Sequence, residues 1–366
     1  MALGRLDITA VRNLQQVSLR DLGMINVFYG ANGGGKTSLL ESIYLLGMAR
    51  SFRSAQINSV IQHEARSCTV YGELRRPEGG YSIVGVTRER TGGVQIKING
   101  SSVTSVSVLA EYLPLQVINA RSFDLLTGSP VDRRRFLDWG VFHVEHHYHG
   151  VWQRFQKCIK QRNSLLRHGK ISAGELRPWS QEFSEAGEQV DLQRQAYFGV
   201  LQPALSGLLE RLSPSLPALE LRYRRGWDKQ SSLLQALQST EKTDREQGYT
   251  HVGPQRADLK LLCDGRDAGA ILSRGQQKLV VCALKLAQGQ LLAQQRGRTC
   301  IYLVDDLPSE LDAEHCRRVC DVLGELNTQV FISCIEKEDI GSSWSDPGLL
   351  ESGAVFHVER GVVRRD

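Results

Sequence analysis

A glycine-rich run between an apolar segment and a helical pattern constrains this chain more than any other feature. The run extends from Gly30 to Thr37 and reads Gly-Ala-Asn-Gly-Gly-Gly-Lys-Thr, directly after the apolar residues 25–29. Apolar residues then recur at helical spacing: Leu39, Leu40, Ile43 and Leu46. A strand, a glycine-rich turn of this spacing and a helix, in that order, predict a phosphate-binding loop.

Each part of the loop has a physical role in holding a nucleotide. Backbone N–H groups and the positive end of the following helix attract phosphates. We expect the backbone contacts to come from Gly30, Ala31, Asn32, Gly33, Gly34 and Gly35. Lys36 would reach the terminal phosphates and act in catalysis, and Thr37 would ligate Mg²⁺. The loop alone does not say which reaction follows, because kinases, motors, transporters and clamps share it.

Composition places the chain among folded globular proteins. Hydrophobic residues make up 41% and charged residues 23% of its 366 residues. The net charge of +5 permits contact with nucleic acid but does not argue for it. The eight cysteines are scattered, the first residues do not resemble a signal peptide, and no apolar stretch approaches the length of a membrane span. We therefore expect a cytoplasmic protein with reduced thiols and no membrane partner.

The order of patterns along the chain predicts an α/β nucleotide-binding domain with an inserted helical unit. Residues 1–120 alternate between strand patterns and the first helix. Residues 121–250 are polar and helical in pattern, and strand patterns return in residues 251–366. We expect the first and last ranges to form one head and the middle range to form an arm.

Local signals refine this organisation. Asn99-Gly100 between two strand patterns predicts a hairpin turn. Within the helical range, we expect Pro203, Pro214 and Pro217 to divide the pattern into several helices, because proline cannot continue a helix without cost.

Two consecutive carboxylates follow an apolar run late in the chain. Residues 301–304 read Ile-Tyr-Leu-Val and are followed by Asp305 and Asp306. An acid at the end of a buried strand is how proteins with a phosphate loop hold Mg²⁺. We assign Asp305 to Mg²⁺ and Asp306 to orienting or deprotonating an attacking water, as a catalytic residue.

A Ser-x-Gly-Gln turn leads into an apolar helical pattern. Ser273, Gly275 and Gln276 form this turn, and its backbone amides would make a second anion site at the start of a helix. An ordinary serine N-cap explains the same residues equally well.

The sequence of motifs resembles that of ABC-type ATPases. The phosphate loop is followed by the Ser-x-Gly-Gln turn, the acidic strand and then Ser-Glu-Leu-Asp at residues 309–312. In that class, the Ser-x-Gly-Gln turn meets the γ-phosphate held by the other subunit. The resemblance therefore implies an ABC-type ATPase head, ATP and Mg²⁺ as cofactors, and an ATP-dependent homodimer.

The long stretch between Thr37 and Ser273 narrows the class further. Membrane-transporter ATPases have much shorter gaps, and long-arm SMC-type proteins insert hundreds of heptad residues that are absent here. The chain also contains the stretches 10–14 (AVRNL), 29–53, 128–139 (GSPVDRRRFLDW), 161–166 (QRNSLL), 248–259 (GYTHVGPQRADL), 272–278 (LSRGQQK) and 303–312 (LVDDLPSELD). With these stretches and an arm of this size, the chain resembles the RecF family of bacterial recombination mediators.

The resemblance implies a function and two further site residues. The family acts in DNA repair and replication. Its members bind double-stranded and gapped DNA, work with RecO- and RecR-type partners to load recombinase, and hydrolyse ATP slowly when DNA stimulates them. Arg12 matches an early arginine that lies near the nucleotide, and Gln116 is a candidate for the glutamine that contacts Mg²⁺ in ABC-type sites.

Several questions stay open at this level. Basic stretches at residues 133–135, 157–170 and 222–227 would meet DNA phosphates, or are solvated helix faces. They contain no base-reading motif, so we expect backbone contact. A transporter ATPase subunit, a short SMC-like clamp and a small-molecule kinase remain alternatives. The kinase would need an acceptor pocket and would have no use for the Ser-x-Gly-Gln turn.

Overall fold

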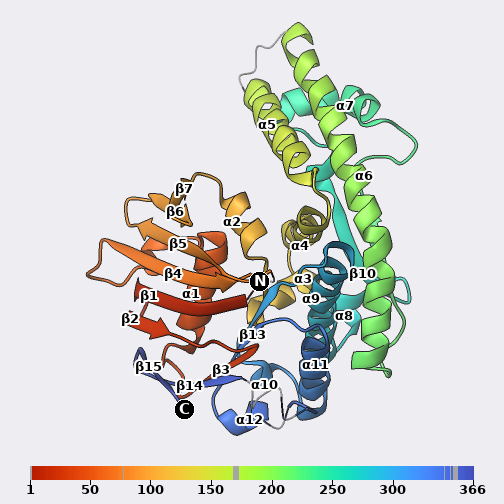
Figure 1. The fold of residues 1–366 in the computed structure, drawn as a ribbon. Coiled ribbons are helices and arrows are strands. Elements are labelled where there is room, and N and C mark those ends of the chain that lie inside the picture. The colour runs from red at the N-terminus through yellow and green to blue at the C-terminus, as the bar shows by residue number, and fades with distance from the viewer. Residues whose placement is uncertain (1, 77, 168–172, 342, 347, 349–352) are drawn as a thin grey trace. The chain divides into compact units, whose positions relative to one another are not determined.

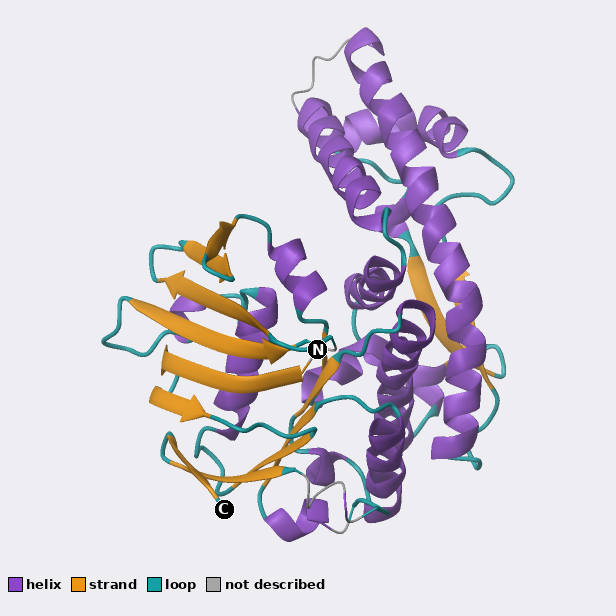
Figure 2. Cartoon of the chain, viewed as in Figure 1, coloured by secondary structure: helices purple, strands orange, loops and turns teal. Residues whose placement is uncertain are grey.

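The computed structural model describes residues 2–76, 78–167, 173–341, 343–346, 348 and 353–366 (Figure 1). By the packing of its residues, the chain forms two compact units. The first comprises Met1–Ser122, Leu208–Pro214 and Lys278–Asp366, and the second comprises Phe123–Gly207 and Ser215–Gln277. The head and arm boundaries expected at residues 120 and 250 stay a prediction. Strands dominate the first unit and helices the second (Figure 2).

An antiparallel sheet forms one layer of the first unit. Its strand order is β2-β1-β4-β5-β6-β7. The strands are β1 (Ala2–Val11), β2 (Leu14–Leu19), β4 (Ser67–Arg75), β5 (Tyr81–Glu89), β6 (Val94–Ile98) and β7 (Ser101–Val103). Burial alternates along β4, as expected for a sheet with one covered face. The expected turn at Asn99-Gly100 is confirmed, because both residues have positive φ, at 50° and 83°.

A second sheet, mostly parallel, carries the loops that concern function. Its strand order is β15-β14-β3-β13-β12-β8, with only β15 antiparallel to its neighbour. The strands are β3 (Ile25–Tyr29), β8 (Leu115–Ile118), β12 (Ile301–Val304), β13 (Val330–Cys334), β14 (Ala354–Glu359) and β15 (Val362–Arg365). Because parallel strands end at the same edge, the loops after β3, β12 and β13 lie next to each other.

Helix α1 (Lys36–Met48) connects the two sheets through a shared core. Leu39, Leu40, Ile43 and Leu46 are fully buried in one cluster with residues of both sheets. The other described helices of this unit include α2 (Val106–Tyr112), α10 (Leu307–Glu310), α11 (Ala313–Glu325) and α12 (Lys337–Gly341), with short turns η1 (Ile57–Ser59) and η2 (Ala120–Phe123). Helix α9 (Arg274–Arg296) begins in the second unit and continues in the first.

The second unit is built mainly from helices. They are α3 (Asp124–Thr127), α4 (Pro130–Val144), α5 (Tyr148–Arg167), α6 (Ala173–Leu212), α7 (Leu233–Gln247) and α8 (Ala268–Ile271), with the turn η3 (Pro254–Arg256). A three-stranded sheet joins them, in the order β11 (Arg266–Asp267), β10 (Asp258–Cys263) and β9 (Leu219–Arg224). The buried Arg162 donates to Asp244 at 2.8 Å, an ion pair that fixes α5 on α7.

Two expectations for this unit are wrong. Pro203 does not end a helix but lies inside the 40-residue α6. Burial of Leu201 and Leu205 on either side of it outweighs the roughly 3 kcal/mol cost of an interior proline. The range expected to be helical also contains the strand β9, because pairing with β10 satisfies its backbone groups.

All eight cysteines are free and buried. Among the described helices, none is both long and apolar enough to span a membrane.

Candidate nucleotide site

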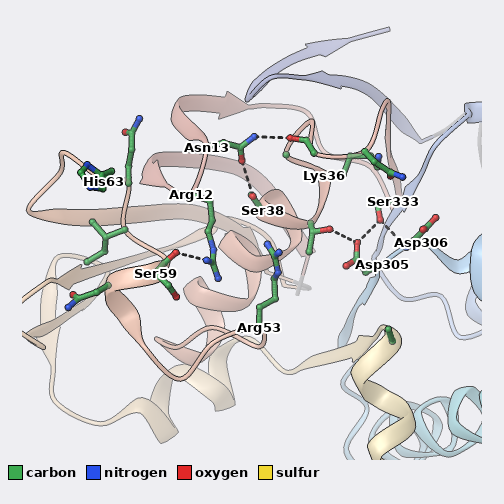
Figure 3. A pocket seen from close by; sticks show the side chains of 18 of the residues that line it. Arg12, Asn13, Lys36, Ser38, Arg53, Ser59, His63, Asp305, Asp306 and Ser333 are labelled. Atoms are coloured by element: carbon green, nitrogen blue, oxygen red, sulfur yellow. Dashed lines mark hydrogen bonds between the residues drawn. The ribbon is translucent and has the colours of Figure 1, made fainter.

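A cavity of about 860 Å³ lies at the edge of the parallel sheet where its strands end (Figure 3). All of its lining residues belong to the first unit. They are Arg12, Asn13, Asn32, Gly33, Gly35, Lys36, Thr37, Ser38, Arg53, Asn58, Ser59, Ile61, Gln62, His63, Arg90, Ala120, Asp305, Asp306, Glu310 and Ser333. The cavity is of the size and mixed polarity that small-ligand sites have.

The phosphate loop forms one wall of this cavity. Gly30, Gly33 and Gly35 have φ values of 139°, 80° and 122°, which L-residues with side chains rarely adopt. The Lys36 ammonium folds back over the loop and donates to the carbonyls of Gly30 and Ala31. The Lys36 ammonium is thus held at the loop by two carbonyl groups, and a bound phosphate can replace them as its partner.

The hydroxyl of Thr37, in the first turn of α1, meets the carboxylate of Asp305, which directly follows β12. Thr37 Oγ1 donates to Asp305 Oδ1 at 3.0 Å, and Ser333 Oγ donates to the same oxygen at 2.8 Å. Burial raises the pKa of Asp305, although both hydroxyl donors favour its ionised form. A hydroxyl and a carboxylate in contact, close to the phosphate loop, fit the oxygen ligands that Mg²⁺ takes beside phosphates. Thr37 and Asp305 would therefore hold Mg²⁺ here.

Asp306 occupies the same cavity in a different environment. Its backbone is left-handed, with φ 59° and ψ 48°, and its N–H donates to Ser333 Oγ at 2.9 Å. Such a conformation costs a non-glycine residue of order 1–3 kcal/mol and persists only where the surrounding structure holds it. The two adjacent carboxylates thus face the cavity with separate surroundings, as two separate roles require.

Arg12 lines the cavity and is held by a buried carboxylate. Its Nε and Nη2 donate to the two carboxylate oxygens of Glu41 at 2.8 Å each, and Nη1 donates to the Ser59 carbonyl. Glu41 is fully buried on α1 and also lies 3.6 Å from the guanidinium of Arg53. Arg12 and Arg53 therefore add positive charge to the cavity that Lys36 lines, and the sequence interpretation had named Arg12 but not Arg53.

Sequence reasoning missed several residues that shape the site. Ser333 bridges the two aspartates, and Asn13 donates to the Gly34 carbonyl at 3.1 Å and accepts from Ser38 at 3.0 Å. Arg90 donates to five backbone carbonyls of the loop that lines the opposite side of the cavity: Asn58, Ile61, Gln62, His63 and Ala65. One sequence signal could have indicated Ser333: it is a polar residue in the otherwise apolar strand β13.

Gln116 does not lie where an Mg²⁺ ligand would be needed. Its side chain is buried, and its Nε2 donates to Gln288 Oε1 on α9 at 2.9 Å. It is not among the residues that line the cavity. The residue sits in the middle of β8, before the edge at which the site forms, so its assignment was wrong.

The Ser-x-Gly-Gln turn begins α9 and lies in the second unit. Ser273 Oγ accepts from the Gln276 N–H at 3.3 Å, and Gln276 Oε1 accepts from the Ser273 N–H at 2.9 Å, which is a capping box. Ser273 and Gly275 are exposed. The serine thus is an N-cap, and the start of the helix remains accessible to a ligand.

Much of the basic character assigned to possible DNA contact is used inside the fold. Arg133 pairs with Asp258 at 2.7 Å, and Arg134 donates to the Ala257 carbonyl at 2.8 Å. Both arginines therefore have partners within the fold, and contact of residues 133–135 with DNA stays a prediction. In the stretch 157–170, Lys157 and Lys160 are exposed, while residues 168–170 lie outside the described part of the chain.

The fold and the cavity together define the class of protein. The fold is that of an ABC-type ATPase head with a helical insertion. Its marks are the phosphate loop after β3, the contact of the Thr37 hydroxyl with Asp305 after β12, and the capped Ser-x-Gly-Gln helix. The family model described as RecF/RecN/SMC N terminal domain matches residues 2–346. The chain belongs to the RecF family within that class.

Curated relatives and solved structures support this assignment. Proteins called "DNA replication and repair protein RecF" from Pseudomonas syringae pv. syringae and Pseudomonas entomophila are each 51% identical over 99% of this chain and 98% of their own. A solved structure of "the recombination mediator protein RecF-ATP in RecFOR pathway" has a TM-score of 0.88 and 26% identity, covering 100% of this chain and 97% of that one. An SMC head domain from Pyrococcus furiosus, 14% identical with a TM-score of 0.58, shares the fold, covering 100% of this chain and 96% of its own.

Proposed function

We propose that this chain is an ATP-dependent DNA-binding protein of recombinational repair and replication. It would dimerise on ATP at gapped or single-strand–double-strand DNA, help RecO- and RecR-type partners to load recombinase, and release DNA when it slowly hydrolyses ATP. The observation that carries the proposal is the contact of Thr37 with Asp305 beside the phosphate loop, in a chain 51% identical to proteins named RecF. Residues 1–120 and 251–366 would act as the ATPase head, and residues 121–250 as its arm, in the cytoplasm.

The side chains divide the work of binding and hydrolysis. The loop amides, Lys36 and Arg12 would hold the phosphates, and Thr37 with Asp305 would hold Mg²⁺, which neutralises charge on the phosphates when bound. Asp306 would position or deprotonate the attacking water. A slow, DNA-stimulated rate of hydrolysis would suit a switch, because the ATP-bound state would then last long enough to hold DNA.

The Ser-x-Gly-Gln turn would complete the site of a second copy. Ser273, Gly275 and Gln276 would contact the γ-phosphate that the other copy holds, so that each nucleotide joins two chains. The exposed, capped start of α9 supports this role, since the positive end of a helix attracts anions.

Size measurement by light scattering tests the proposal. The wild type should be monomeric without nucleotide and dimeric with ATP and Mg²⁺, and gapped DNA should strengthen the dimer. Lys36→Ala should stay monomeric and should lose ATP binding in isothermal titration, because the cation at the terminal phosphates is gone. A wild type that binds ATP but never dimerises would contradict the switch and favour a kinase. Copurification with a membrane partner would favour a transporter subunit.

A further inference from the structure

The hairpin formed by β14 and β15 ends in a tight turn beside the phosphate loop. Glu359 pairs with Val362, so that Arg360 and Gly361 alone form the connection. Both have positive φ, at 49° and 81°, which identifies a type I′ hairpin turn. The backbone of this turn meets the phosphate loop, which lies more than three hundred positions earlier in the sequence.

Backbone atoms of this hairpin touch the phosphate loop directly. The Gly361 N–H donates to the Gly34 carbonyl at 2.7 Å. The Val358 carbonyl oxygen would lie 2.4 Å from a Cβ placed on Gly30 and 2.6 Å from one on Gly34. The hairpin therefore requires glycine at two positions of the loop, for reasons independent of the phosphates.

This contact sets the direction of one amide of the loop. In a trans peptide the carbonyl and the following N–H point in opposite directions. The Gly34 carbonyl accepts from the Gly361 N–H and from Asn13 Nδ2 at 3.1 Å, so both of its lone pairs are used and its direction is fixed. The Gly35 N–H of the same peptide is then directed to the opposite side, and Gly35 lines the cavity.

The hairpin is well placed to hold the loop because it is anchored on the strand that leads into it. Strand β14 pairs in parallel with β3 from Ala354 to His357. The Tyr29 hydroxyl, one residue before the loop, donates to the Asp366 carboxylate at 2.9 Å. Both contacts tie the hairpin to β3 and so to the residues just before the phosphate loop.

We propose that Gly361 is a positioning residue for nucleotide binding. Its amide holds the Gly34–Gly35 peptide in the orientation that presents an N–H to phosphate, so the hairpin turn sets affinity without touching the ligand. This inference rests on the proposed ATP binding and adds a part of the chain that sequence motifs do not mark.

Gly361→Ala tests the role. The new Cβ would lie 2.2 Å from the Asn13 carbonyl oxygen and would occupy an unfavourable positive φ, so the turn must shift. The Kd for ATP should rise on the order of tenfold, the scale of losing one hydrogen bond. The Kd for inorganic tripolyphosphate should rise by the same factor, because the defect lies in the phosphate cradle. The value of kcat at saturating ATP should stay near that of the wild type.

Val362→Ala is the matched control, because Val362 is 54% exposed on the same hairpin. It should leave both Kd values unchanged. A purely structural role for Gly361 would reduce the folded fraction measured by circular dichroism and leave the Kd of the folded molecules unaltered. That result, or a variant with wild-type affinity, would overturn the inference.

Hydrogen exchange of the wild type tests the role of Gly361 even if Gly361→Ala does not fold. Coupling is reciprocal, so ATP must strengthen the contact if the contact favours ATP. Exchange of the segment 358–362 should slow when ATP binds, while that of the segment 94–98 should not. If the chain binds ATP and exchange of the segment 358–362 does not change, the role proposed for Gly361 is refuted, but the proposed function is not. A wild type that does not bind ATP would refute the proposed function as well.

Discussion

At the scale of single residues, the site separates two neighbouring carboxylates. Asp305 is buried and accepts from two hydroxyls, whereas Asp306 has a left-handed backbone and is held through its N–H. Ser333 is common to both environments, since it donates to Asp305 and accepts from Asp306. A change in one aspartate should therefore have a different effect from the same change in the other.

Asp306→Asn should leave binding of ATP and Mg²⁺ intact and slow hydrolysis on the order of 10²-fold or more, because asparagine keeps the size but cannot accept a proton. The ATP-bound dimer and its hold on DNA should last longer. Asp305→Asn should instead weaken Mg²⁺-dependent binding. Single-turnover hydrolysis and dimer lifetime measure both effects. Wild-type hydrolysis by Asp306→Asn would place the base elsewhere, and loss of ATP binding would mean that the two roles are reversed.

A lysine within α9 leads to a prediction about pH. Burial lowers the pKa of Lys285 from 10.5 to about 8, so the unfolded chain binds more protons than the folded one between these values. The contribution of Lys285 to stability therefore rises as pH increases through this window. Lys285→Met should raise Tm by about 2 °C or more at pH 7, and its advantage should shrink toward pH 10. A pH-independent difference in calorimetry would show that burial of the lysine's charge is not the cause.

At the scale of elements, helix α9 joins a polar start to an apolar continuation. Its start is exposed at Ser273 and Gly275 and closed by the Ser273–Gln276 capping box, and most residues from Leu279 to Leu292 are buried. The helix therefore holds the Ser-x-Gly-Gln turn on a rigid element, which is how a binding group keeps its direction.

Ser273→Arg should block dimerisation while a single chain still binds ATP, because the turn is proposed to act on the nucleotide of a second copy. Loss of the cap should itself cost about 1 kcal/mol. Ser273→Asp is the matched control for the cap, since aspartate caps helices but repels phosphate. It should keep the Tm and also lose the dimer. If Ser273→Arg dimerises with ATP as well as the wild type, the ABC-type use of this turn is wrong.

At the scale of the whole molecule, some basic residues that could meet DNA are instead bonded to other parts of the protein. Arg133 and Arg134 stabilise the second unit, and reversing them should unfold it before it informs on DNA. Lys157 and Lys160 of α5 are exposed and one turn apart. These two lysines are better candidates for contact with the DNA backbone.

Reversal of Lys157 and Lys160 to glutamate should weaken DNA binding uniformly across sequences, because phosphates carry no sequence information. The slope of log affinity against log salt should become shallower by about 0.9 for each phosphate that the variant no longer neutralises. Fluorescence anisotropy over a salt series measures both. Lys97→Glu, an exposed charge on β6, is the control and should have little effect. An unaltered slope in the double variant would show that this face of α5 is simply solvated.

The sequence alone determined the features that depend on neighbours along the chain. The phosphate loop, the Asn99-Gly100 turn, the apolar strand before Asp305 and the helix cap at Ser273 each follow from a few adjacent residues, because glycine conformation, strand burial and capping are local physics. The motif order then indicated the family, which the comparisons show. These features could therefore be predicted without knowing how the rest of the chain folds.

Only the tertiary structure decided which distant residues meet. Nothing local marks Ser333 as the link between two aspartates, Glu41 as the holder of Arg12, or Gly361 as a support of the phosphate loop. Pro203 within α6 and the strand β9 were misjudged for the same reason, since packing of distant groups outweighed local propensity. These contacts arise where the sheet places its strand ends side by side, and that order is a property of the fold as a whole.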